Sequence, residues 1–173
     1  MKKNVTLFFV CIIVSAAKSQ TISPADFFQS ATCTNFDCFK KTALANGLTK
    51  EESPYKDASG VEHQIFFNPG YEEDNIQVYS IGISLSDIKT TVFLKSKNIG
   101  FFENFINGII TSEQFYVTQG NTIEDETIYS TYSSKKDPGY EIRLEGYYDK
   151  EDATTYAVIK LTHLKNKQET SLK

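Results

Sequence analysis

Cys33 and Cys38 are the two cysteines that follow the first twenty residues, and four residues separate them. Residues five apart in one continuous helix have Cα atoms more than ~8 Å apart, whereas a disulfide closes only below roughly 7 Å. Thr34 and Asn35 lie between the cysteines and can interrupt a helix, because both residue types favour the N-cap position. The spacing therefore predicts a structural disulfide between two short helices. Redox chemistry would instead favour Cys-x-x-Cys at the start of a helix that follows a strand.

The two histidines, His63 and His163, are the other candidates for metal binding or general base catalysis. Both fall in predicted strands, and neither has a partner at the spacing of a zinc-binding helix. The segment SIGISLS (80–86) contains three serines but lacks the Gly-x-Ser-x-Gly pattern that exposes a nucleophile. We therefore expect no metal ion and no cofactor, and a hydrolase of this sequence would need a site dispersed along the chain.

Acidic residues gather at three places in the sequence. They are Glu72, Glu73 and Asp74; Glu124, Asp125 and Glu126; and Glu141 and Glu145. Glycoside hydrolysis needs two carboxyl groups in one cleft with well-separated pKa values. The first two clusters lie in or beside loop-like segments, which is typical of solvated charge. YEED (71–74) also lacks the residue order of a calcium-binding loop.

Tyrosine is concentrated in the C-terminal third of the chain, where strands are predicted. The residues are Tyr129, Tyr132, Tyr140, Tyr147, Tyr148 and Tyr156. Alternation places Tyr140 and Tyr148 on an apolar strand face and Tyr147 on the charged face. Tyrosine offers a rigid contact area with a polar tip, so exposed clusters favour recognition of a protein or glycan. Cross-strand packing is the alternative. The candidate partner-binding residues are Tyr129, Tyr132, Tyr147 and Tyr156.

Two short helices are predicted near the N-terminus, one on each side of the cysteine spacing. Ser23 can cap the first helix, and Pro24 suits its first position because proline lacks only an amide that would have no partner there. Apolar periodicity predicts the second helix at 36–45, and Gly47 favours its end. Residues 49–60 are polar and are expected to connect these helices to the strands.

A third helix is predicted at about 99–110, with Asn98 as its cap. Its apolar residues recur at helical spacing and form one stripe: Phe102, Phe105, Ile106, Ile109 and Ile110. Strands are predicted at 61–67, 75–85 and 89–96 before it, and at 114–118, 126–134, 140–148 and 154–164 after it. The connections 135–139 and 149–152 are too short for a crossover helix, so these strands are expected to be antiparallel neighbours.

The order of elements predicts an α+β fold: two short N-terminal helices, then a mainly antiparallel sheet of about seven strands packed on one central helix. Residues 20–164 form a single domain in this interpretation, and 165–173 form a flexible tail. A strongly curved sheet would form a cleft around helix 99–110, whereas a flat sheet would leave none.

The first nineteen residues have the three parts of a secretory signal peptide: a basic start, an apolar run and a small-residue end. Ala17 and Ser19 occupy the positions that signal peptidase reads, which predicts cleavage between Ser19 and Gln20. The apolar run of about 13 residues is shorter than the ~20 residues of a membrane-spanning helix. We therefore expect a protein that is secreted or periplasmic and not embedded in a membrane.

Cleavage after Ser19 would remove three lysines and leave 15 basic against 22 acidic residues, a net charge of −7. Arg143 is the single arginine. Nucleic-acid binding depends on cationic groups, arginine above all, so this balance argues against it. The sequence favours a non-enzymatic binding protein, for example of the inhibitor or immunity type, that meets a protein partner through its tyrosine-rich sheet face or edge. The alternatives are a carrier that holds a small apolar ligand between the sheet and helix 99–110, and the dispersed hydrolase.

Overall fold

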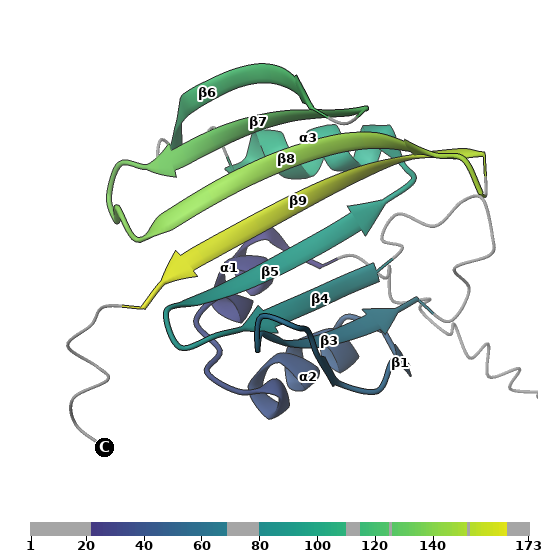
Figure 1. Ribbon diagram of the computed structural model, residues 1–173, viewed down its shortest axis with the longest axis vertical. Coiled ribbons are helices and arrows are strands. Elements are labelled where there is room, and N and C mark those ends of the chain that lie inside the picture. The colour runs from purple at the N-terminus through teal and green to yellow at the C-terminus, as the bar shows by residue number, and fades with distance from the viewer. Residues whose placement is uncertain (1–21, 69–79, 110–114, 125, 152, 166–173) are drawn as a thin grey trace, which may run out of the picture.

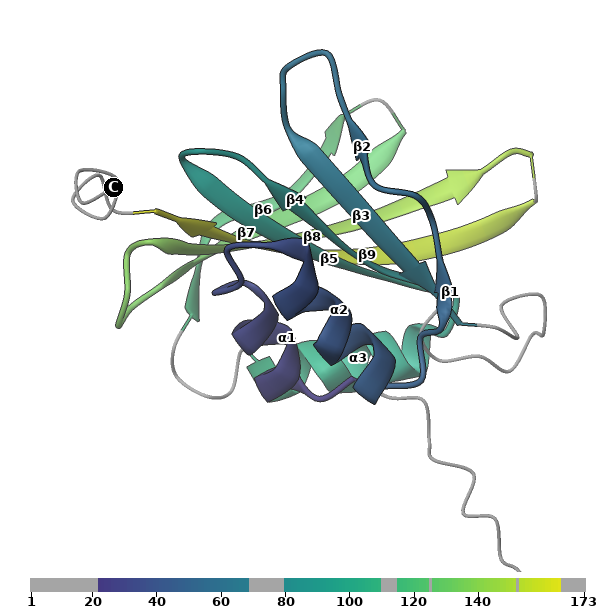
Figure 2. The ribbon, with the colours of Figure 1, turned by 90° about the horizontal axis from the view of Figure 1, so that it is seen from below.

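The computed structural model describes residues 22–68, 80–109, 115–124, 126–151 and 153–165. Within these residues the chain forms the α+β fold that the sequence predicts, with three helices on one face of an antiparallel sheet (Figures 1 and 2). The helices are α1 (Pro24–Ser30), α2 (Phe36–Ala45) and α3 (Ile99–Ile109). The predicted signal peptide, the acidic cluster at 72–74 and most of the predicted tail lie outside the described residues.

The sheet contains nine strands in the described part of the chain. They are β1 (Lys50–Glu51), β2 (Tyr55–Lys56), β3 (Glu62–Phe67), β4 (Ser80–Leu85), β5 (Lys89–Ser96), β6 (Phe115–Glu124), β7 (Thr127–Ser134), β8 (Tyr140–Asp149) and β9 (Thr154–Leu164). Their order is β1-β3-β4-β5-β9-β8-β7-β6, and β2 also pairs with β3. The strand count exceeds the expected number of about seven by β1 and β2. These two strands arise because the polar connector 49–60 folds back along β3 in two short pairings.

The predicted disulfide joins Cys33 and Cys38, whose Cα atoms are 5.6 Å apart, between α1 and α2. The Asn35 side chain accepts a hydrogen bond from the Cys38 backbone N–H at 2.9 Å and so caps α2. Gly47 ends this helix with a φ of 77°, and the Leu48 N–H donates to the carbonyl of Ala43. Capping and the short disulfide loop hold the two helices in a fixed turn.

The core lies between the sheet and the helices. One cross-strand row on the helix-facing side consists of Phe66, Ile81, Leu94 and Ile159, and each of these side chains is fully buried. α1 and α2 cover β3, β4 and β5, with Phe27 and Phe39 fully buried beneath them. α3 connects β5 to β6, and Figure 1 shows it behind β7 and β8.

α3 begins as predicted, because the Asn98 side chain accepts a hydrogen bond from the Phe101 N–H at 2.8 Å. Its apolar residues form the predicted stripe, but the structure buries the two edges of this stripe to different extents. Phe105 and Ile109 are buried, and the ring of Phe105 packs edge-on against Phe27 at 5.6 Å. Ile99 is 47% exposed, and Phe102 is half-buried. No helix in the described residues is long and apolar enough to cross a membrane.

Candidate functional site

An open cleft of about 770 Å³ lies between α3 and the helix-facing side of β6–β9. α3 contributes the less buried edge of its apolar stripe to the cleft. The residues of α3 that line the cleft are Ile99, Phe102, Glu103, Ile106 and Asn107, which follow the i, i+3, i+4, i+7, i+8 spacing of a single helical face. The cleft therefore has an apolar wall that the core covers only in part.

The floor of the cleft is open because small residues meet there across the strands. Ala157 of β9 pairs with Ser96 on one side and with Gly146 on the other, and Gly146 pairs with Ile128 of β7. A Cβ atom added to Gly146 would meet no other atom within 4 Å. The next row contains the larger residues Leu94, Ile159 and Leu144. The space under α3 therefore follows from the small size of Ala157 and Gly146.

The opposite wall comes from β7 and β8. Leu144 and Tyr132 are half-buried and line the cleft, while Ile128 is 52% exposed at its mouth. Ser130 is buried and donates a hydrogen bond to the Asn121 side chain on β6 at 2.6 Å. The cleft thus combines apolar walls with a few polar groups, which is typical of sites for small molecules.

The charges at the cleft are carboxylates. Glu103 projects from α3, and in the described structure it has no ion-pair partner. Glu145 also borders the cleft, but alternation turns its carboxylate to the opposite sheet face, where Lys160 lies at 2.7 Å and Arg143 at 2.9 Å. None of the described residues that line the cleft is a lysine, arginine or histidine.

The four candidate tyrosines are divided between the two faces of the sheet. Tyr129, Tyr132 and Tyr156 all border the cleft, but alternation directs only Tyr132 to the helix-facing side. Tyr129, Tyr147 and Tyr156 point to the face without helices. The rings of Tyr147 and Tyr156 pack at 5.7 Å, and Lys95 Nζ lies 3.6 Å from the centroid of Tyr156. Tyr156 is only 1% exposed, so its ring packs within the protein. Their role in partner binding stays a prediction.

On the face without helices, hydrogen bonds connect a serine, a histidine and an aspartate, in the order Ser–His–Asp of a catalytic triad. Ser84 Oγ lies 2.9 Å from His63 Nδ1, and Asp57 Oδ2 lies 3.0 Å from His63 Nε2. The other carboxylate oxygen of Asp57 accepts hydrogen bonds from the N–H groups of Ser59 and Val61. The hydrogen bond from His63, followed by that from Val61, lowers the pKa of Asp57 below its usual value.

The sequence alone did not reveal this hydrogen-bonded group of Ser84, His63 and Asp57, although one local signal for it was present. Asp57 begins the segment DASG (57–60), which is typical of a turn, and a hairpin there brings Asp57 back beside His63.

Ser84 lacks the surroundings that a nucleophile requires. It lies in the middle of β4, which is hydrogen-bonded to β3 on one side and β5 on the other. The sheet therefore occupies the backbone N–H groups that would have to stabilise an oxyanion. The ring of Tyr55 stacks on His63 at a centroid distance of 4.8 Å. We interpret the hydrogen bonds among Ser84, His63 and Asp57 as structural: they hold the β2–β3 hairpin against the sheet.

The two histidines do not form a joint site. His63 lies on the face without helices, whereas His163 lies on the helix-facing side of β9 and stacks on Tyr140 at 4.3 Å. β4 and β5 separate their strands. Among the described residues, no group of three or more His, Cys, Asp or Glu side chains could hold a metal ion.

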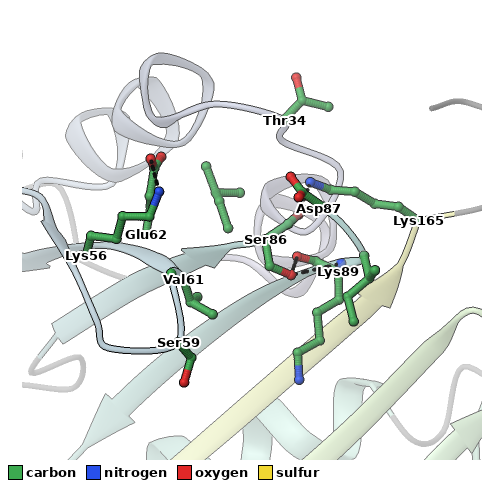
Figure 3. Close-up of a pocket in the computed structure, with 12 residues that line it drawn as sticks. Thr34, Lys56, Ser59, Val61, Glu62, Ser86, Asp87, Lys89 and Lys165 are labelled. Atoms are coloured by element: carbon green, nitrogen blue, oxygen red, sulfur yellow. Dashed lines mark hydrogen bonds and ion pairs between the residues drawn. The ribbon is translucent and has the colours of Figure 1, made fainter. Parts of the chain in front are cut away.

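A second hollow of about 550 Å³ lies beside the β4–β5 hairpin (Figure 3). Two of its three lysines already contact neighbours in the same protein. Lys165 Nζ donates to the carbonyl of Ser86 at 2.6 Å, and Lys56 lies 3.6 Å from Glu62. Figure 3 shows Lys89 pointing away from these groups. This hollow offers less apolar surface for a ligand than the cleft under α3.

Comparison of the chain with protein-family models, curated proteins and solved structures finds no match.

Proposed function

We propose that the protein binds a small amphipathic molecule in the cleft between α3 and β6–β9. The observation that carries this proposal is the open floor at Gly146 beneath a half-exposed apolar face of α3. Each Å² of apolar surface that a ligand covers contributes roughly 25 cal/mol, and the volume of about 770 Å³ suits a ligand of drug-like size. Two apolar surfaces that face each other across an unfilled space favour a function as a carrier or sensor of such a molecule.

A pair of glycine substitutions tests the cleft. Gly146 and Gly120 both lie in strands with no atom within 4 Å of an added Cβ, but Gly120 lies on the edge strand β6, outside the cleft lining. Titration with the neutral dye Nile red should give the same fluorescence increase for the wild type and Gly120→Leu. Gly146→Leu should weaken binding at least tenfold while circular dichroism stays unchanged. Equal binding by all three proteins, or none by the wild type, would refute the proposal.

Export from the cytoplasm is the second part of the proposal. The disulfide between Cys33 and Cys38 is compatible with an extracytoplasmic location, because such bonds persist in oxidising compartments. The signal-like first nineteen residues point the same way. N-terminal sequencing of the protein recovered from the periplasm or medium should begin at Gln20. A chain that retains Met1 and stays in the cytoplasm would contradict export.

A protein partner, of the inhibitor or immunity type, is the other candidate function. It is favoured by the sheet face that carries no helix, where Arg143 lies 4.0 Å above the ring of Tyr129 and Tyr147 is half-buried. Aromatic and arginine side chains are frequent anchors of interfaces. Tyr129→Ala and Tyr147→Ala should each reduce capture of such a partner from the native envelope or medium, whereas Tyr55→Ala, at the far end of the sheet, should not. Equal capture by all variants would exclude this face.

A further inference from the structure

We infer that the cleft ligand is a cationic amphiphile: an apolar chain or ring system that carries an ammonium group. This inference rests on the proposed function and names the chemistry of the same site. Glu103 is the starting point, because its carboxylate stands at the cleft with no ion-pair partner among the described residues. An anionic head group would meet this carboxylate without any cation from the described lining to balance it.

The aromatic rings at the cleft favour the same charge. Phe102 is adjacent to Glu103 on the cleft face of α3, and Tyr132 stands on the opposite wall. An ammonium group over an aromatic face is attracted by the negative face of the ring, and the attraction is stronger when water is excluded. Ammonium recognition by proteins commonly combines aromatic faces with a carboxylate, and this cleft supplies both.

The geometry also separates the head group from the tail. Glu103 and Asn107 form the polar part of the α3 face, while Ile99, Phe102 and Ile106 form its apolar part. At the floor, Gly146 has no side chain and Ala157 has only a methyl group, so the floor carries no charge. An apolar tail would therefore lie along the floor, and its ammonium group would remain beside Glu103 near water.

The test compares three amphiphiles that each contain a straight chain of twelve carbons and differ in the head group: dodecyltrimethylammonium, dodecyl maltoside and dodecanoate, whose carboxylate carbon is the twelfth. Each compound is titrated, below its critical micelle concentration, into the full protein with bound Nile red, and displacement of the dye is measured. We expect dodecyltrimethylammonium to bind at least tenfold more tightly than dodecanoate, with the maltoside between them. Glu103→Gln should weaken binding of the ammonium compound about threefold to tenfold and leave binding of the maltoside unchanged.

Glu52→Gln is the matched control, because Glu52 is an exposed carboxylate outside the cleft and its loss changes the net charge by the same amount. If Glu52→Gln weakens ammonium binding as much as Glu103→Gln, the preference comes from overall charge and the inference is wrong. If Nile red binds but the three amphiphiles bind equally, or dodecanoate binds most tightly, the inference fails and the ligand-binding function stands. If neither the dye nor any amphiphile binds, both proposals fail.

Discussion

The two halves of the sheet follow the same rule of alternation but differ in the size of their helix-facing residues. Under α1 and α2, the row from Phe66 to Leu94 is made of large side chains, and the space is filled. Under α3, the neighbouring helix-facing row contains Gly146 and Ala157, and a cleft of about 770 Å³ remains. The same helix-on-sheet architecture thus gives a rigid core at one end and room for a ligand at the other.

The largest expected effect is on the free energy of unfolding, when a phenylalanine of the filled half and one of the open half are each replaced by alanine. Phe39 is fully buried against Phe66 at a ring distance of 5.8 Å, so Phe39→Ala should reduce the free energy of unfolding by about 3 to 5 kcal/mol. Phe102 is half-buried at the cleft, and Phe102→Ala should cost about 1 kcal/mol or less while it weakens dye binding. Urea denaturation measures both values. Equal losses of stability would show that the two halves are packed alike.

The disulfide is expected to have the next largest effect, and it belongs to the filled half. Closing so short a loop contributes about 2 kcal/mol in the chain-entropy model. The double variant Cys33→Ser, Cys38→Ser should lose about that amount in urea denaturation and keep its affinity for the dye, since α1 and α2 lie away from the cleft. A loss of dye binding by a folded double variant would show that the two halves are coupled.

A smaller effect comes from two glycines, one in each half. At Gly82 an added Cβ would lie 2.1 Å from the ring of Phe93, so Gly82→Ala should destabilise the protein by about 1 to 3 kcal/mol. At Gly146 there is open space, and Gly146→Ala should be neutral or stabilising by up to about 1 kcal/mol. Thermal unfolding of the two variants checks this difference. The opposite order would mean that the space at Gly146 is filled.

The smallest expected effect concerns pH and the β2–β3 hairpin at the end of the filled half. Because folding lowers the pKa of Asp57 below 3.8, this group stabilises the folded state above that pH, and the stabilisation disappears as the pH falls through the lower, folded-state value. His63→Gln removes the largest cause of the lowered pKa, so unfolding free energies measured from pH 5 to pH 2 should fall less steeply in this variant. Equal slopes in the wild type and His63→Gln would contradict this role of the hydrogen bond.

Ser84 provides a check on the chemical interpretation of the same hairpin. If Ser84, His63 and Asp57 only fasten the hairpin, a serine-directed fluorophosphonate should not modify the folded protein, as intact mass would show. Modification of Ser84 that disappears in His63→Gln would contradict the structural role and restore the hydrolase.

Several features followed from local sequence signals because local physics determines them. The cap at Asn35, the terminator at Gly47 and the spacing of Cys33 and Cys38 act within a few residues, and each appears in the structure as predicted. The alternation in β8 also placed Tyr140 and Tyr147 on opposite faces, as the register requires. Such signals depend on neighbouring residues alone, so a single sequence is enough to interpret them.

The cleft and the hairpin network were decided by contacts between residues far apart in the chain. Helical spacing grouped Phe102 and Phe105 in one stripe, and only the position of α3 against the sheet buried one edge of this stripe more than the other. Gly146 and Ala157 meet through a strand register that no local pattern specifies. The sequence by itself therefore determined the α+β architecture and the disulfide. The tertiary structure decided where space remains, because packing depends on which side chains are brought together.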